Sequence, residues 1–172
     1  GGLLLAVFGF VCMMLVNDMA TVWWLVAGTI IMGVGIMPMM ILGTDLVISS
    51  APAEKAGAAS ATSETATELG MAMGIAVIGS IGAAVYRRQM TDSIPISVPV
   101  EQAEIAIDTI GGALGVIARL PAEPAADLLL AVQQAFSAAL HTNAIIGALI
   151  MFLTAMLTAR FLRHLPVLSA PH

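Results

Sequence analysis

Three carboxylic acids, Asp45, Glu64 and Glu68, lie within or beside long apolar runs of the chain. An ionisable side chain is costly inside a membrane, so a functional role is its default interpretation there. Glu64 and Glu68 have the i, i+4 spacing that places two side chains on one helix face, a turn apart. Two neighbouring carboxyl groups repel each other when charged and exchange protons as a coupled pair. The pattern predicts a site that holds either protons or a cation, which is the chemistry of a proton-driven pump.

Hydroxyl side chains surround this pair, at Thr62, Ser63, Thr65 and Thr67. A polar patch on an apolar helix should face a bundle interior or a water-filled cavity. The alternative for Glu64 is a position close enough to the membrane interface to be simply solvated. For Asp45 we favour an interfacial, solvated or helix-capping role, with transport as the alternative, because a polar segment follows at 49–56.

Other reactive residue types form no recognisable site. Met32, Met37, Met39 and Met40 cluster near Pro38 and are interpreted as core or lipid-facing residues, with an adaptable ligand surface as the alternative. His141 is interpreted as interfacial. The sequence contains no metal-ligand cluster, nucleophile elbow or phosphate loop. We therefore expect no enzyme activity, no metal and no cofactor.

The composition indicates a membrane protein. Of the 172 residues, 59% are hydrophobic and 10% are charged, against roughly 25% charged in soluble domains. The mean hydropathy of +1.00 requires lipid around much of the chain. Six dispersed basic residues exclude a nucleic-acid footprint. The single Cys12 excludes a disulfide framework.

Four apolar runs are long enough, or nearly so, for the roughly 20 residues that a membrane-crossing helix needs. We expect an all-α membrane protein with residues 1–86 forming three transmembrane helices at about 1–17, 22–49 and 57–87, and a last one at 136–163. Trp23 and Trp24 suit a membrane interface. Pro38 predicts a kink, and the Gly70/Gly74 pair predicts close helix contact.

Residues 87–135 are charged and amphipathic, and they predict a helical hairpin outside the bilayer. Helical periodicity favours helices at 99–119 and 124–136. No breaker separates Pro124 from Arg160, so the second arm should run almost directly into the last helix.

The charge distribution gives an orientation. With four membrane-crossing helices, one side of the membrane carries Lys55, Arg160 and Arg163. The positive-inside rule predicts that this side, which also carries the tail 164–172, is cytoplasmic. Residues 87–135 then lie on the outer face, although Arg87 and Arg88 oppose this assignment. The chain begins Gly1-Gly2-Leu3, without an initiator Met or a signal peptide, so we expect a fragment whose upstream part is missing.

The third apolar run resembles the penultimate helix of QacA-type drug:proton antiporters, from the fourteen-helix branch of the major facilitator superfamily. The resemblance rests on three segments of the chain: Ala53–Ser60, Ser63–Gly70 and Gly74–Ser80. It extends over essentially the whole chain, since these antiporters also carry a helical hairpin before their last helix. It implies the last four helices of such a pump, and part of a facilitator C-terminal half.

The resemblance implies a bacterial inner-membrane protein that exports lipophilic or quaternary ammonium cations in exchange for protons. Glu64 and Glu68 match acids tied to cation recognition and proton coupling. Ser63-Glu64 stands where the family has two consecutive acids, which puts divalent cations in doubt. The fragment alone should be inactive without the missing N-terminal helices. The alternatives are a facilitator exporter of another substrate, a small membrane assembly or interaction protein, and a membrane-embedded enzyme.

Overall fold

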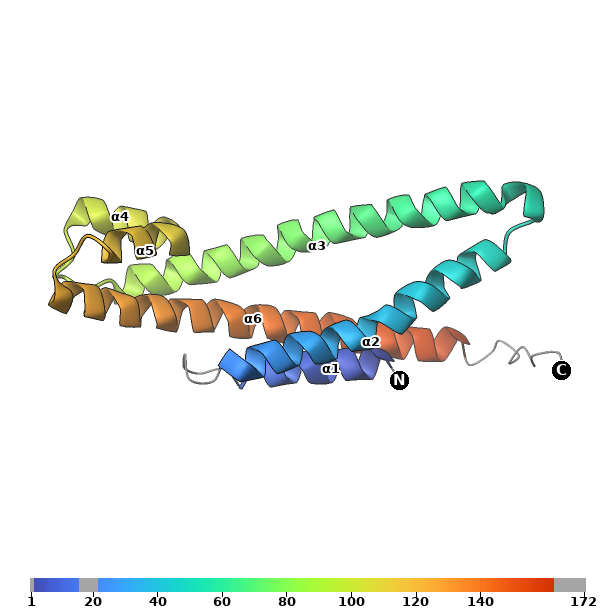
Figure 1. The fold of residues 1–172 in the computed structure, drawn as a ribbon, viewed down its shortest axis with the longest axis horizontal. Helices are drawn as coiled ribbons and strands as arrows, with labels where there is room; N and C mark the ends of the chain where they lie inside the picture. Colours follow the sequence, from blue (N-terminus) through green and yellow to red (C-terminus); the bar gives the residue numbers. More distant parts are fainter. Residues whose placement is uncertain (1, 16–21, 163–172) are drawn as a thin grey trace.

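All regular structure in the described residues is helical. A computed structural model describes residues 2–15 and 22–162. Figure 1 shows the elements in chain order: α1 (Gly2–Met13), α2 (Val22–Ser49), the 3-10 turn η2 (Ala53–Lys55), α3 (Ala56–Ser93), α4 (Val100–Asp108), α5 (Ile110–Ile117) and α6 (Ala122–Leu162). The all-α class predicted from the sequence is confirmed.

Three described helices are long and apolar enough to cross a membrane. The segments are Trp23–Ser49, Ala53–Ser93 and Ala122–Arg160. The first helix, α1, is apolar but only 12 residues long. It is therefore shorter than the span expected at 1–17, and Leu15 N donates to Cys12 O at 3.1 Å in a tightened final turn. Residues 16–21 and 163–172, with the ends of the helices expected at 1–17 and 136–163 and the expected cytoplasmic tail 164–172, lie outside the described residues.

Glycines bring α1 and α2 into close contact. A Cβ on Gly9 would lie 2.7 Å from Gly28 O, and one on Gly28 would lie 2.6 Å from Gly9 O. Gly35 packs in the same way on Ala6, where a Cβ would lie 2.6 Å from the backbone nitrogen. The close helix contact expected at Gly70/Gly74 is not formed within the described chain, because a Cβ at either position would meet nothing within 4 Å. Small residues allow helix backbones to approach in lipid, and here they do so between α1 and α2.

Pro38 lies inside α2, and Figure 1 shows the second half of α2 turning away from α1 and α6 towards the start of α3. Proline has no N–H to donate to the preceding turn, and its ring crowds that turn, so a bend is expected there. Met39, Met40, Ile41 and Leu42, which follow the bend, are all exposed. The kink predicted from Pro38 agrees with this geometry.

The segment between α3 and α6 differs in detail from the expected hairpin. Helix α3 continues to Ser93, six residues beyond the expected 87. The expected helix at 99–119 is two helices, because Thr109 is extended with φ −149° and ψ 152°. Its Oγ1 accepts a hydrogen bond from Gly112 N at 3.0 Å and so caps α5. Two following glycines, Gly111 and Gly112, also weaken helix continuity across this point.

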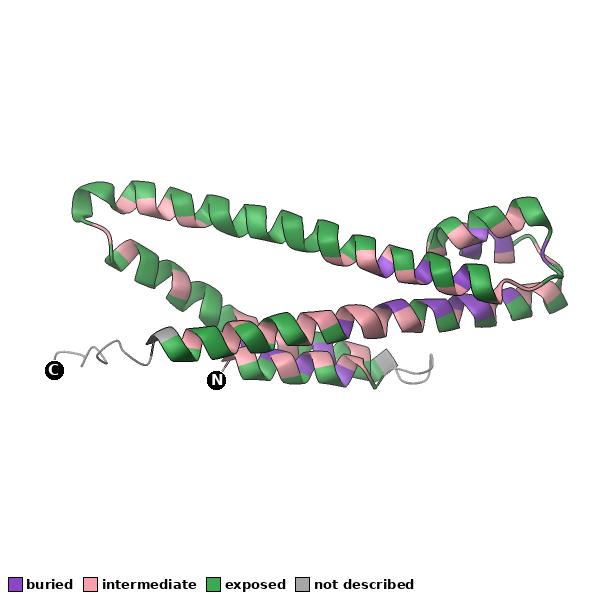
Figure 2. Cartoon of the chain, turned by 180° about the vertical axis from the view of Figure 1, so that it is seen from behind, coloured by how far each residue is buried: buried purple, intermediate pink, exposed green. Residues whose placement is uncertain are grey.

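The main core of the described chain lies where α4 and α5 pack on the end of α3 and the start of α6 (Figures 1 and 2). Met90 and Leu128 are fully buried there. The Tyr86 hydroxyl donates to Ala106 O in α4 at 3.0 Å. Helix α6 runs unbroken from this core to Leu162, as the absence of a breaker after Pro124 predicts. At roughly 1.5 Å per residue, α3 and α6 each exceed the ~30 Å of bilayer hydrocarbon, so both extend beyond it.

Candidate functional site

Glu64 and Glu68 lie in the half of α3 that is furthest from the core. Both are exposed, and neither has a hydrogen bond or ion pair with any residue that the structure describes. The neighbouring hydroxyls are satisfied within the helix: Thr62, Thr65 and Thr67 donate to the carbonyls of Ala58, Ala61 and Ser63 at 2.8–2.9 Å. The two carboxylates are therefore the charged groups of this patch that have no polar partner among the described residues.

The periodicity of α3 shows which way these carboxylates project. Glu64 precedes Gly82 by 18 residues, and Glu68 precedes Tyr86 by 18. Because an α-helix has about 3.6 residues per turn, 18 residues are five full turns. Helix α3 is continuous and contains no proline. Glu64 and Glu68 therefore project from the face of α3 that carries Gly82 and Tyr86, which are buried at the other end.

This face is directed towards α6. A Cβ on Gly82 would lie 2.5 Å from Asn143 Nδ2 of α6, so the two helices touch there. Ile150 and Leu157 follow Asn143 at steps of seven, and so form one stripe on α6. In Figure 1 the antiparallel α3 and α6 diverge from this contact towards the start of α3. Leu157 follows Asn143 by 14 residues, and Glu68 precedes Gly82 by 14 residues. Because the two helices are antiparallel, Leu157 and Glu68 lie at a similar height along the helix axes.

The acid-bearing face of α3 and the apolar stripe of α6 are thus turned towards the same space between the two diverging helices. Ile150, Leu153 and Leu157 are 43–51% exposed. Residues 64–77 of α3 are all exposed, as the green stretch along the middle of α3 in Figure 2 shows. Carboxylates can bind a positive charge or a proton, and apolar side chains can hold the hydrophobic body of a cation. Nothing in the described chain covers this face.

Asp45 lies on a different helix from this pair. It lies inside α2, one turn before the helix ends at Ser49, and it is exposed. The helix-capping role considered for it is wrong, since a cap would lie at a helix end. The hydrogen bonds at the end of α2 come from Ser49 and Ser50, whose hydroxyls donate to Leu46 O and Val47 O.

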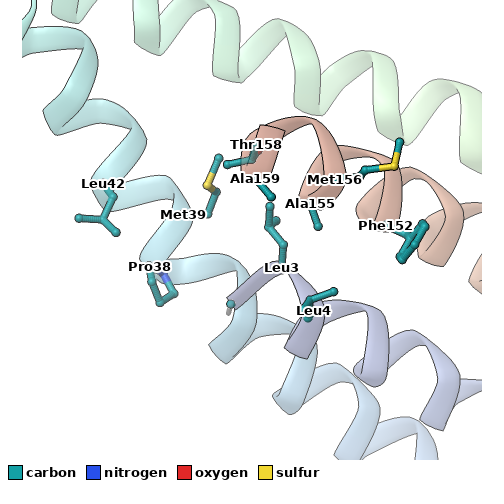
Figure 3. Close-up of a pocket in the computed structure, with 11 residues that line it drawn as sticks. Leu3, Leu4, Pro38, Met39, Leu42, Phe152, Ala155, Met156, Thr158 and Ala159 are labelled. Carbon is teal, nitrogen blue, oxygen red and sulfur yellow. The ribbon is translucent and has the colours of Figure 1, made fainter. Parts of the chain in front are cut away.

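A pocket of about 570 Å³ lies on the opposite side of α6, between α1, α2 and α6 (Figure 3). Phe152 is nine residues, or two and a half turns, from Asn143, so this wall of α6 faces away from α3. The lining is almost entirely apolar, and it includes Met39 and Met156. Of the predicted methionine cluster, Met39 lines this pocket, and Met37, Met39 and Met40 are all exposed. The pocket and the two acids are therefore separate features.

Asn143 is a polar residue that the sequence reasoning did not single out. It is a lone amide within the apolar part of α6, and that contrast was the available signal. Its Oδ1 is buried and has no hydrogen-bond partner among the described residues. His141, two residues earlier in α6, is partly buried. Among the described residues, no group of three His, Cys, Asp or Glu could hold a metal ion.

The fold defines an all-helical, multi-pass membrane protein with unpartnered acids on one long helix. The sequence of this chain is similar to those of several known proteins. The chain is 36% identical to the multidrug efflux pump LfrA of Mycolicibacterium smegmatis over 154 residues, which are 90% of this chain and 30% of LfrA. It is 30% identical to the methyl viologen resistance protein SmvA of Salmonella typhimurium over 139 residues, covering 79% of this chain and 27% of SmvA.

A third relative is the tetracenomycin C resistance and export protein of Streptomyces glaucescens, 40% identical over 50 residues, which are 29% of this chain and 9% of that protein. These relatives are drug efflux and resistance proteins. The chain spans about 30% of the length of LfrA. No family model and no solved structure matches the chain.

Proposed function

We propose that this chain is the C-terminal part of a proton-coupled multidrug efflux transporter of the QacA type, within the major facilitator superfamily. The geometry that supports the proposal is the shared face of α3, on which Glu64 and Glu68 point towards α6 without partners. A lipid-exposed carboxylate costs about 2.5–3.5 kcal/mol at the centre of a bilayer. Further helices of the same transporter would cover this face and enclose a cavity.

In this proposal Glu68 is the principal proton-coupling residue, and Glu64 contributes to cation recognition. A lipophilic cation binds the deprotonated pair, with its hydrophobic body against the apolar stripe of α6. Protonation from the other side of the membrane neutralises the same carboxylates and releases the cation. Because one carboxylate cannot bind a proton and a cation at full strength together, the two ligands exchange. The substrates are lipophilic cations, including quaternary ammonium compounds.

The proposed setting is the bacterial inner membrane, with Lys55 and Arg160 on the cytoplasmic side and the α4–α5 hairpin on the outer face. The efflux and resistance proteins to which the chain is similar support export over the other roles. Export of a different class of substrate by a facilitator protein is the second candidate, because two of the relatives are named for compounds of different chemistry, tetracenomycin C and methyl viologen.

Dye efflux from energised membrane vesicles tests the proposal in the full-length transporter that contains this chain. Glu68→Gln imitates the protonated state, so efflux of a cationic dye driven by a pH gradient should be lost at an unchanged protein level. Glu64→Gln should narrow the range of exported dyes more than it lowers the rate. Thr65→Val is the matched control, because the Thr65 hydroxyl is already bonded to Ala61 O. Efflux at the wild-type rate in Glu68→Gln would remove α3 from the coupling mechanism.

A further inference from the structure

Asn143 lies in the largely apolar part of α6, directly after His141 and Thr142. Its Oδ1 is buried and has no partner among the described residues. Buried polar atoms in native proteins are nearly always hydrogen-bonded, so an exception calls for an explanation. A leucine of similar size would fill the same space without this cost. The amide is therefore a candidate for binding a group that arrives from outside the chain.

Asn143 also lines a pocket of about 330 Å³ at the junction of three helices. Phe10 and Met13 of α1 and Ile78 of α3 form its walls, with Ile150 and other α6 residues. The lining is apolar apart from the asparagine. Rotation about the terminal torsion of asparagine is broad and roughly two-fold, and in the inferred site this rotation turns the amide oxygen towards the pocket.

The position of the pocket connects it with the two acids. Asn143 packs on Gly82, and Gly82 lies five turns along the same face of α3 from Glu64. The pocket therefore lies at the end of the acid-bearing face where α3 and α6 meet. Glu64 and the contact with this amide therefore lie along one face of α3, roughly 27 Å apart at 1.5 Å per residue.

We propose that this pocket is a second subsite for the transported cation, and that Asn143 is its specificity-determining residue. The inference rests on the proposed export of lipophilic cations. The amide oxygen accepts a hydrogen bond from the N–H of a protonated amine. A quaternary ammonium ion has no N–H and cannot make this bond. The subsite therefore favours protonated amines over quaternary ammonium ions of the same size and charge.

Binding of two matched probes to the purified full-length transporter tests the subsite. Dodecyldimethylamine, protonated at neutral pH, and dodecyltrimethylammonium share their chain and charge and differ in one N–H. The wild type should bind the protonated amine about tenfold more tightly, the factor of roughly one hydrogen bond to a charged group. Asn143→Leu should reduce this ratio to about one while leaving the affinity for the quaternary ion within roughly twofold.

Thr142→Val is the control, because the Thr142 hydroxyl already donates to Ala138 O at 2.9 Å, and it should keep the wild-type ratio. Equal affinities for the two probes in the wild type overturn the inference, whether or not the variants fold. A ratio retained in Asn143→Leu, or the same loss for both probes, also overturns it. Selective binding without any transport would contradict the proposed efflux but leave the subsite standing.

Discussion

Gly28 shows how single residues set the contact between α1 and α2. Gly28→Ala would place a Cβ 2.6 Å from the carbonyl oxygen of Gly9, so the helices must move apart. Overpacking of this kind costs about 1–3 kcal/mol. We expect a lower free energy of unfolding, measured by circular dichroism during SDS titration in detergent micelles.

Gly33→Ala is the control in the same helix, because a Cβ there meets no described atom within 4 Å. It should be neutral or should stabilise the chain by up to about 1 kcal/mol, since alanine is the better helix former. Equal destabilisation by the two variants would contradict the close contact of α1 and α2.

The two acids show what spacing in the sequence can predict. The i, i+4 spacing of Glu64 and Glu68 was enough to place them on one face of a helix. The spacing could not predict which helix this face is directed towards, because that direction depends on where Gly82 and Tyr86 pack. The Gly70/Gly74 motif failed within this chain for the same reason: small residues permit close contact but do not specify a partner. Whether Glu64 and Glu68 bind protons remains a prediction.

At the scale of elements, Tyr86 fastens α4 to α3. Tyr86→Phe removes the hydrogen bond to Ala106 O and leaves the ring in the core. We expect a loss of about 1 kcal/mol in the local stability of α4. Hydrogen–deuterium exchange of residues 100–108 should therefore become faster, while exchange in α1 is unchanged.

Asp108→Asn is the matched control, since it weakens the ion pair with Arg87, a 3.9 Å contact between two well-exposed side chains. Exposed pairs contribute about 0–1 kcal/mol, so exchange in α4 should change little. If both variants accelerate hydrogen–deuterium exchange in α4 equally, the hydrogen bond of the Tyr86 hydroxyl does not specifically stabilise α4.

Helix α6 and the α4–α5 pair mark the limits of predicting elements from this sequence. Continuity from Ala122 to Leu162 followed from the lack of a breaker after Pro124. The division between α4 and α5 was missed, because apolar periodicity continues through Ile107, Ile110 and Leu114. The Thr109 cap and the adjacent glycines determine that break, and they were weaker signals than the periodicity.

At the scale of the whole molecule, the orientation in the membrane can be measured by cysteine labelling. In a Cys12→Ala background, we expect Asp108→Cys to react with an impermeant maleimide on intact cells. Lys55→Cys should react only after permeabilisation, because positively charged loops are retained in the cytoplasm. The reverse pattern would show that the assigned orientation is inverted.

Composition alone identified the class of the molecule, since 59% hydrophobic residues cannot form a soluble fold of this size. The site is harder to predict, because the exposed face of α3 lacks its neighbours within the described chain. A cavity is formed by several helices, and its shape is not encoded in one of them.

Proton release on cation binding tests the central claim most directly, namely that Glu68 exchanges a proton for a cation. The full-length transporter, purified in weakly buffered detergent solution with a pH indicator, is mixed with a saturating lipophilic cation. We expect the wild type to release protons and Glu68→Gln to release markedly fewer while still folding. Proton release from Glu68→Gln equal to that of the wild type would show that this carboxyl group is not the exchanging site.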